Sequence, residues 1–293
     1  MPDKYCDTPD RPLPIAATLW TSLRLPAGAA SCFAPDMSFL IICTAAGLAA
    51  VMTFFSGFGL GTLLLPAFAL FFAIEKAVAL TAIVHFLNGI FKLALVRKHV
   101  NVAITLRFGL PAAIGALVGA WLLVRMAEAG ALLQYSLLGR NIEFAPAKVI
   151  IGILLLVFAC AEFLPAFRKI TFAPKHQIPG GLLCGFFGGL AGLQGALRSA
   201  FLVKAGLDKA GYVATGAAVA FLIDLSRLSM YAQLIVNQHA GFDYALLAAA
   251  VCAALAGSVL GNRYLHKATL PGIQKLVAVL LFVIALSMIT GLL

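Results

Sequence analysis

The chain has 293 residues, of which 62% are hydrophobic and only 11% are charged, and its mean hydropathy is +1.03. A soluble globular domain carries about a quarter charged residues, so this composition excludes a soluble protein and indicates an integral membrane protein. The net charge of +10 would suggest a nucleic-acid partner in a soluble chain. Here the Lys and Arg residues stand between apolar segments, which is the pattern of membrane topology. We therefore expect the lipid bilayer, and no nucleic acid, as a partner.

Residues 1–36 are polar and rich in proline, and we expect a tail or a short surface helix there. Ten apolar segments follow, and most of them approach the ~20 residues that cross a bilayer core. Two of the ten are too short for that. In chain order the predicted segments are Ser38–Phe55, Thr62–Ile74, Ala77–Val96, Ile104–Val124, Lys148–Pro165, Ile178–Leu193, Ala196–Leu207, Ala210–Leu228, Tyr244–Leu260 and Leu276–Leu293. The short segments, Thr62–Ile74 and Ala196–Leu207, are expected to be half-helices or re-entrant limbs.

Matching landmarks in the two halves indicate a duplication. Each half carries a glycine-rich run, an acidic-Lys-Ala triplet and a Gly-x-x-x-Gly helix in the same order. The matched pairs are Phe54–Gly61 with Phe186–Gly195, Glu75–Ala77 with Asp208–Ala210, Asn88 with Asp224, and Gly115 and Gly119 with Gly257 and Gly261. We therefore predict one transmembrane repeat over 37–167, a basic cytoplasmic linker over 168–177 and a second repeat over 178–293.

The short segments decide the symmetry of the two repeats. If both count as crossings, each repeat has five segments and the halves are inverted relative to the membrane; if neither does, the halves are parallel. Five crossings place the basic groups around Arg97, Lys175, Lys204 and Arg263 on the cytoplasmic side. The parallel arrangement would export the last two of these groups. We therefore predict an all-α polytopic membrane fold of two inverted repeats with glycine-broken or re-entrant short helices.

The glycine-rich run Gly180–Ser199 contains the sharpest candidate site. Glycines four residues apart let helix backbones approach closely in lipid, and breaks at Gly192 and Gly195 would leave backbone amides beside Arg198. A cation and amide donors at membrane depth indicate an anion site. The position that corresponds to Arg198 in the first half is Leu64. The alternative is an arginine that reaches the membrane interface or forms a structural ion pair.

Two further groups of polar residues lie within apolar segments. Asp224 and Arg227 are spaced i, i+3 and can pair on one helix, as a structural staple or as a proton-linked gate. His85, Asn88 and Lys92 share one helix face, where polar residues line a cavity or hold helices together. His85 can act there as a packing residue or as a proton carrier.

Enzyme, metal and nucleotide motifs are missing from the sequence. It has no His-Glu-x-x-His, no Gly-x-Ser-x-Gly and no P-loop. The six cysteines show no Cys-x-x-Cys spacing, and we expect buried thiols. We predict no catalysis, no cofactor and no metal. Thr81 and Thr215, which stand near the starts of equivalent helices, are expected to bond their own backbones.

The duplicated Phe-Phe-[Ser/Gly]-Gly runs, the acidic-Lys-Ala triplets and the Gly-x-x-x-Gly helices resemble those of the TauE/SafE family of membrane transporters, also called the toluene-sulfonate uptake permease family. The resemblance covers about residues 37–293. It implies a multi-pass carrier of the bacterial inner membrane, built from two related halves, for sulfite, sulfonates, sulfoacetate and related anions. Gln194 and Arg198 stand where the family often has glycine and apolar residues, and so they are candidates for the specificity of this chain.

These observations lead to one hypothesis: a secondary transporter that moves a small, sulfur-containing anion by alternating access. An anion channel and a non-transporting membrane scaffold or biogenesis protein stay open as alternatives, as does a homo-oligomer. The predicted substrate-binding residues are Arg198, Gln194, Gly192, Gly195, Gly59, Gly61, Asn88 and Lys92. The predicted gating or coupling residues are Asp224, Arg227 and His85.

Overall fold

The computed structural model describes residues 30–52, 60–129, 133–137, 140–144, 146–163, 170–237, 243–263 and 271–290. Ten α-helices run through these residues, with two short 3₁₀ helices, η1 (Arg97–His99) and η2 (Pro174–His176). The α-helices are α2 (Ala30–Met52), α3 (Leu60–Ala69), α4 (Ile74–Val96), α5 (Val102–Glu128), α6 (Pro146–Phe163), α8 (Gln177–Ala191), α9 (Gly195–Leu202), α10 (Lys209–Asn237), α11 (Tyr244–Arg263) and α12 (Pro271–Ile289). The ten predicted apolar segments are thereby confirmed in their order. Helix α2 begins at Ala30, within the stretch that was predicted as a tail.

Helices α3 and α9 are short, as predicted. They have 10 and 8 residues, which at ~1.5 Å per residue gives lengths of about 15 and 12 Å. Neither reaches across a ~30 Å hydrocarbon core. Helix α9 ends at Leu202, before the predicted boundary at Leu207, and a turn with a left-handed glycine, Gly206 (φ 75°), separates it from α10.

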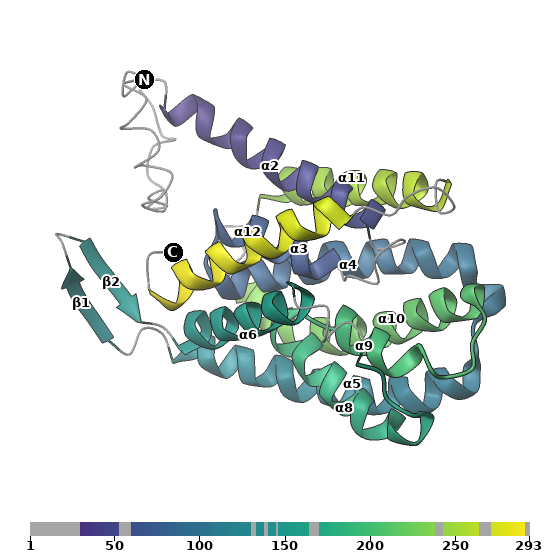
Figure 1. Cartoon of the computed structure of the whole chain (residues 1–293). Coiled ribbons are helices and arrows are strands. Elements are labelled where there is room, and N and C mark those ends of the chain that lie inside the picture. Colours follow the sequence, from purple (N-terminus) through teal and green to yellow (C-terminus); the bar gives the residue numbers. More distant parts are fainter. Residues whose placement is uncertain are drawn as a thin grey trace.

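A β-hairpin interrupts the helices between α5 and α6. Strands β1 (Leu133–Leu137) and β2 (Arg140–Phe144) pair antiparallel, with Leu133 opposite Phe144. In Figure 1 the hairpin projects from one end of the helical body. No strand was predicted here, although β1 alternates apolar and polar residues, as an amphipathic strand does.

Glycines bring α5 and α8 into backbone contact, and the two helices lie side by side in Figure 1. A Cβ placed on Gly185 of α8 would lie 1.8 Å from the Ala112 carbonyl oxygen of α5. From the other helix, a Cβ on Gly119 of α5 would lie 2.1 Å from the carbonyl oxygen of Phe186 in α8. No side chain fits at either position without moving a backbone. The predicted role of these glycines in helix packing is confirmed.

The same kind of contact joins α11 to α2. A Cβ on Gly257 would lie 2.3 Å from the Gly47 carbonyl oxygen. Gly257 corresponds to Gly115, whose own Cβ would lie 2.2 Å from the carbonyl oxygen of Leu182 in α8. The fourth helix of each predicted repeat therefore packs on the first helix of the other. Helix α4 packs on α10 and α6 on α12, so each of these helices meets the one predicted to be its counterpart.

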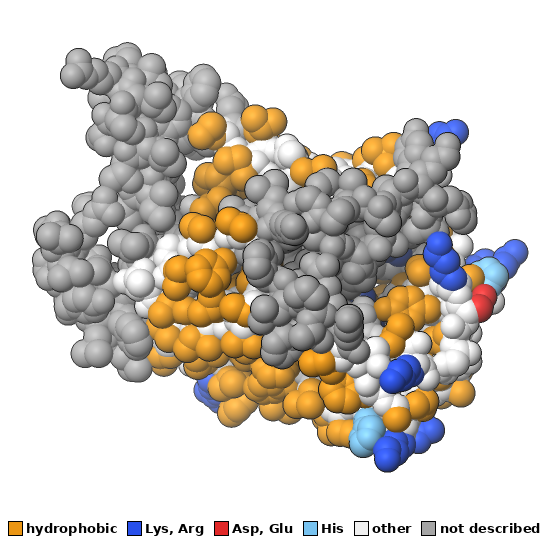
Figure 2. Space-filling model, in the orientation of Figure 1, with side chains coloured by type: hydrophobic (Ala, Val, Ile, Leu, Met, Phe, Trp, Pro, Cys, Tyr) orange, Lys and Arg blue, Asp and Glu red, His pale blue; other side chains and the backbone are white. Residues whose placement is uncertain are grey.

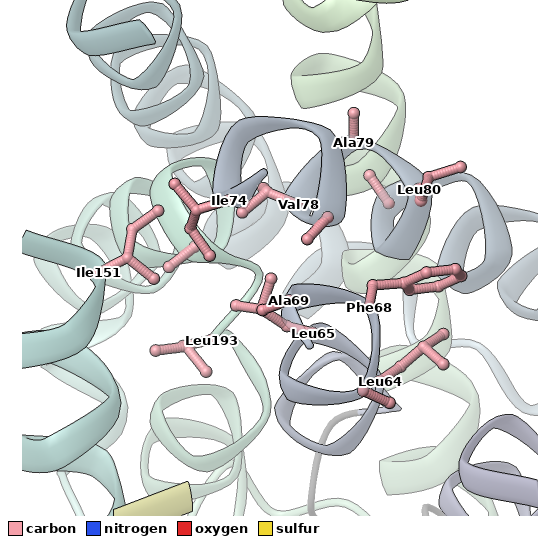
Figure 3. Close-up of a cluster of buried hydrophobic side chains, with 14 of the residues drawn as sticks. Leu64, Leu65, Phe68, Ala69, Ile74, Val78, Ala79, Leu80, Ile151 and Leu193 are labelled. Atoms are coloured by element: carbon pink, nitrogen blue, oxygen red, sulfur yellow. The ribbon is translucent and has the colours of Figure 1, made fainter. Parts of the chain in front are cut away.

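Apolar side chains fill the centre of the bundle and also cover its outside. Figure 3 shows the central cluster, in which Phe68 of α3 lies on the same side as Leu80 of α4, while Leu193 lies on the side of Ile151 in α6. Outside, α5 exposes a stripe of large apolar side chains that includes Leu110, Ile114, Val118 and Trp121. Figure 2 shows such side chains over a wide area of one face. An exposed apolar surface of this kind suits contact with lipid.

Four helices in the described part are long and apolar enough to cross a membrane. They are Ile74–His99, which includes η1, Val102–Glu128, Lys209–Ala232 and Tyr244–Gly261. Basic side chains gather near one end of the molecule, where α4 ends and α8 begins (Figure 2). There η1 packs against α10, while η2 packs against α8 and α9.

Candidate functional site

The site is organised by the break between α8 and α9. Helix α8 ends at Gly192, which is left-handed with φ 74°. The Gly192 amide donates to the Gly188 carbonyl at 2.9 Å and the Leu193 amide donates to that of Phe187 at 3.4 Å. The first of these bonds, from the amide of the left-handed residue to the carbonyl four residues earlier, is that of the αL C-terminal cap, which requires the left-handed conformation that glycine adopts most easily. Gln194 then turns the chain into α9 at Gly195, so the predicted break is confirmed.

The glycine-broken segment of the first half meets this break directly. A Cβ on Gly61, at the start of α3, would lie 2.8 Å from the Gly192 carbonyl oxygen. The two backbones therefore cross with no room for a side chain at Gly61. We refer to this point as the Gly61/Gly192 crossing. Gly59, the other predicted residue of the first glycine cluster, lies outside the described residues.

One carboxylate stands at the centre of the site. Asp224 of α10 is fully buried, and its Oδ2 lies 2.5 Å from Nδ1 of His85 in α4. Its Oδ1 accepts hydrogen bonds from Nε2 of Gln194 at 3.1 Å and from Nε of Arg227 at 3.0 Å. Asp224 thus ties α4, the α8/α9 turn and its own helix together. The predicted pairing of Asp224 with Arg227 is confirmed, and His85 is an additional partner from the other half.

Arg227 links this carboxylate to the end of α8. Its side chain is fully buried, and its Nη1 donates to the Gly188 carbonyl at 3.4 Å. One turn further along α10, the Tyr231 hydroxyl donates to the Gly189 carbonyl. The last carbonyls of a helix lack partners within the helix and attract positive charge. Arg227 therefore neutralises Asp224 and caps α8 at once.

Arg198 and Lys92 add positive charge on one side of this centre. Nη1 of Arg198, on α9, lies 3.5 Å from Oε1 of Gln194, at the limit of a hydrogen bond. The Arg198 side chain is half-buried and packs over Gly216 of α10. Lys92 lies two turns after His85 on α4. Leu64, the counterpart of Arg198, is fully buried in the apolar core instead (Figure 3).

Asn88 does not join the group around Asp224. Its Oδ1 accepts a hydrogen bond of 2.6 Å from the hydroxyl of Ser258, and both side chains are buried. This bond ties α4 to α11, as expected of a polar residue that holds helices together. The polar stripe His85, Asn88 and Lys92 therefore has contacts with more than one neighbour. Ser258 was missed in the sequence because a serine in an apolar helix commonly bonds its own backbone.

The two matched threonines, Thr81 and Thr215, differ in their hydrogen bonding. Thr215 accepts a 3.0 Å hydrogen bond from the backbone amide of Asn101, at the start of α5. The hydroxyl of Thr81 is buried and has no hydrogen-bond partner in the described part of the chain. The expectation that both bond their own backbones is therefore wrong.

The described residues contain no group of three or more His, Cys, Asp or Glu side chains that could hold a metal ion. The cysteines whose side chains are described, Cys43, Cys160, Cys184 and Cys252, are free thiols, but Cys160 and Cys252 are exposed, so the expectation of buried thiols is wrong for these two. Cys184 is buried against the α8/α9 turn, where its thiol lies 3.4 Å from the Gln194 carbonyl oxygen. The polar side chains that the site brings together are those of Asp, Arg, His and Gln residues.

The family model of the sulfite exporter TauE/SafE matches residues 42–288, which include both glycine-broken segments and every residue of this site. The chain belongs to the TauE/SafE family. The comparison with curated proteins and the comparison with solved structures found no match. As a TauE/SafE protein with several long apolar helices, the chain is a multi-pass membrane transporter. The resemblance inferred from its sequence motifs is confirmed.

Proposed function

We propose that this TauE/SafE chain is a secondary transporter of a small sulfur oxyanion, such as sulfite or an organic sulfonate, in the inner membrane. The observation that carries the proposal is the charge around Asp224. Arg227 pairs with this buried carboxylate, Arg198 contacts Gln194, which donates to the same carboxylate, and His85 occupies its other oxygen. Even with His85 neutral, the two arginines outnumber the carboxylate.

An excess of positive charge within membrane helices is costly unless an anion shares the site. Arg198 is the best placed residue to hold that anion. It is half-buried, and its contact in the site is the neutral amide of Gln194. Arg227, by contrast, is already paired with Asp224. We assign Arg198, Lys92 and Gln194 to substrate binding, with Gly192, Gly195 and Gly61 shaping the backbone around them. His85, Asp224 and Arg227 are assigned to gating or coupling.

Alternating access between inverted repeats is the proposed mechanism. The exchanged packing of α5 on α8 and of α2 on α11 supports a two-fold relation between the repeats 37–167 and 178–293. The antiparallel course of α4 and α10 supports the inverted form of that relation. Their contacts run in opposite directions along the two helices, from His85 with Asp224 to His99 with Gly211. Two helices related by inversion across the membrane run in this way.

Cysteine labelling tests the inverted arrangement. In a cysteine-free background, single cysteines at Lys98, Lys175 and Lys204 are expected to react with a membrane-impermeant maleimide from one side. Cysteines at Glu128 and Asp243 are expected to react from the other side. All five residues are exposed and lie at or near helix ends. Labelling of Lys204 from the Glu128 side would support the parallel arrangement and contradict the proposal.

Flux through proteoliposomes tests the function. We expect saturable movement of at least one sulfur oxyanion from a panel of sulfite, sulfoacetate, taurine, sulfate, acetate and chloride. The variant Arg198→Gln is expected to lower the initial rate at low substrate roughly tenfold to a hundredfold, because it removes one charge-assisted hydrogen bond. Arg198→Lys keeps the charge and should retain part of the rate.

Arg107→Gln provides the matched control, since Arg107 is an exposed arginine on α5 outside the site. It should transport like the wild type. Normal flux through Arg198→Gln would show that Arg198 is structural. A flux that rises linearly with the gradient would identify a channel instead of a carrier. No flux of any anion on the panel would contradict transport of these anions and leave the scaffold hypothesis.

A further inference from the structure

Two buried side-chain polar atoms in the described part of the chain make no hydrogen bond: the Thr81 hydroxyl oxygen and Nη2 of Arg227. Nη2 lies 2.8 Å from Oδ1 of Asp224, within ion-pair distance, but its N–H groups are not directed for a hydrogen bond. Thr81 is 1% exposed and Arg227 is fully buried. A buried polar group without a partner costs free energy, so each of these atoms requires an explanation.

Both atoms belong to residues beside the Gly61/Gly192 crossing. The methyl carbon of Thr81 lies 3.8 Å from the position of a Cβ on Gly61. Nη1 of Arg227 lies 2.9 Å from the position of a Cβ on Gly192. The crossing itself brings these two glycines together. The two residues that carry the unsatisfied atoms therefore both lie beside the point where the broken segments meet.

The register of α4 against α10 places Thr81 and Arg227 at one level. His85 meets Asp224, Phe86 stacks on Phe221 with ring centroids 5.4 Å apart, and His99 meets Gly211. Each step forward on α4 thus corresponds to a step back on α10. Thr81, one turn before His85, then falls level with Arg227, about one turn after Asp224.

The same register places the other cations on the opposite side of Asp224. Lys92, two turns after His85, falls level with Gly216, over which Arg198 packs. Between the two levels lies a layer in which Asp224 binds His85 and Gln194. The site thus has a half-buried level at Arg198 and a fully buried level at Thr81, with the carboxylate layer between them.

We propose that Thr81 and Arg227 form a second anion-binding position, which receives the oxyanion after it passes the layer of His85, Asp224 and Gln194. This inference rests on the proposed function and extends it from one binding position to two. The Thr81 hydroxyl and Nη2 of Arg227 each donate to an oxygen of the anion.

Calorimetric titration of sodium sulfite into the purified protein in detergent tests the second position. Thr81→Val removes the hydroxyl and keeps the shape of the side chain, and it is expected to weaken sulfite binding about tenfold. Thr81→Ser keeps a hydroxyl and should bind sulfite within a few-fold of the wild type. Without sulfite, Thr81→Val should melt no lower than the wild type, because the hydroxyl that it removes has no partner in the protein.

Thr215→Val is the matched control, because Thr215 is the counterpart of Thr81 and has a protein partner. It should lower the melting temperature without weakening sulfite binding. The inference is overturned if Thr81→Val binds sulfite like the wild type, if the wild type binds none, or if Thr81→Val melts lower and Thr81→Ser restores the melting temperature. Flux that is independent of Thr81 would overturn the second position and leave transport standing. Sulfite binding that depends on Thr81, without any flux, would support the second position and contradict transport.

Discussion

Replacing Asp224 with Asn is expected to remove both transport and much of the protein's stability. The Asp224 carboxylate neutralises Arg227, and both side chains are fully buried. It also holds His85 and Gln194 in place. Breaking a buried ion pair by removing one partner costs about 3–5 kcal/mol, because the other charge stays buried without compensation. Thermal unfolding in detergent and flux through proteoliposomes measure the two losses.

A double variant separates lost charge balance from lost packing. Asp224→Asn combined with Arg227→Met removes both charges, and it is expected to be more stable than Asp224→Asn alone. The recovery should be incomplete, because Met cannot donate to the Gly188 carbonyl as Arg227 does. If Asp224→Asn unfolds at the temperature of the wild type, the carboxylate does not balance Arg227 and this account is wrong.

Replacing Gly192 with Ala is expected to destabilise the protein far more than the same change at Gly206. The two glycines have nearly the same backbone conformation, with φ of 74° and 75°. A Cβ on Gly206 meets no atom within 4 Å, so Gly206→Ala measures the left-handed strain alone, about 1–2 kcal/mol. A Cβ on Gly192 would lie 2.9 Å from Nη1 of Arg227. Arg227 cannot withdraw without leaving Asp224, and this crowding should add about 1–3 kcal/mol.

The two variants are compared by thermal unfolding and by flux. Gly206→Ala should transport nearly as well as the wild type, since Gly206 lies in the exposed turn between α9 and α10. Gly192→Ala should lose most of its flux because it displaces the guanidinium group of Arg227. Equal losses of stability in the two variants would mean that backbone strain, and not the contact with Arg227, makes glycine necessary at Gly192.

The helices of this fold could be read from the sequence because apolar segments in membrane proteins are long and are separated by basic or turn residues. The pairs Gly115 with Gly119 and Gly181 with Gly185 also predicted close helix packing, since glycine spacing on one helix face is a local property. Their partners could not be predicted. That α5 packs on α8, and not on a neighbour from its own half, depends on contacts between distant segments.

Contacts between distant segments also limited how much of the site could be predicted from the sequence. The pair of Asp224 and Arg227 was predictable from the i, i+3 spacing on one helix. The bond from His85 to Asp224 was not, because it joins two helices that are far apart in the sequence. Thr81 could be matched with Thr215 but not assigned to the site, since what distinguishes it is the partner that it lacks in the fold. The hairpin β1–β2 did have a local signal, the alternation in Leu133–Leu137, but it was too short to stand out in a helical protein.

The exchanged glycine contacts also bear on how the chain is made. The ribosome completes α5 before α8 exists, and α2 before α11. Each of these early helices enters the membrane with a face of small residues whose partner has yet to be synthesised. The first half therefore cannot close on itself, and its final packing must wait for helices of the second half. Biosynthesis of this protein is expected to end in a late assembly step, during which the early helices are open to capture by an insertase or to proteolysis.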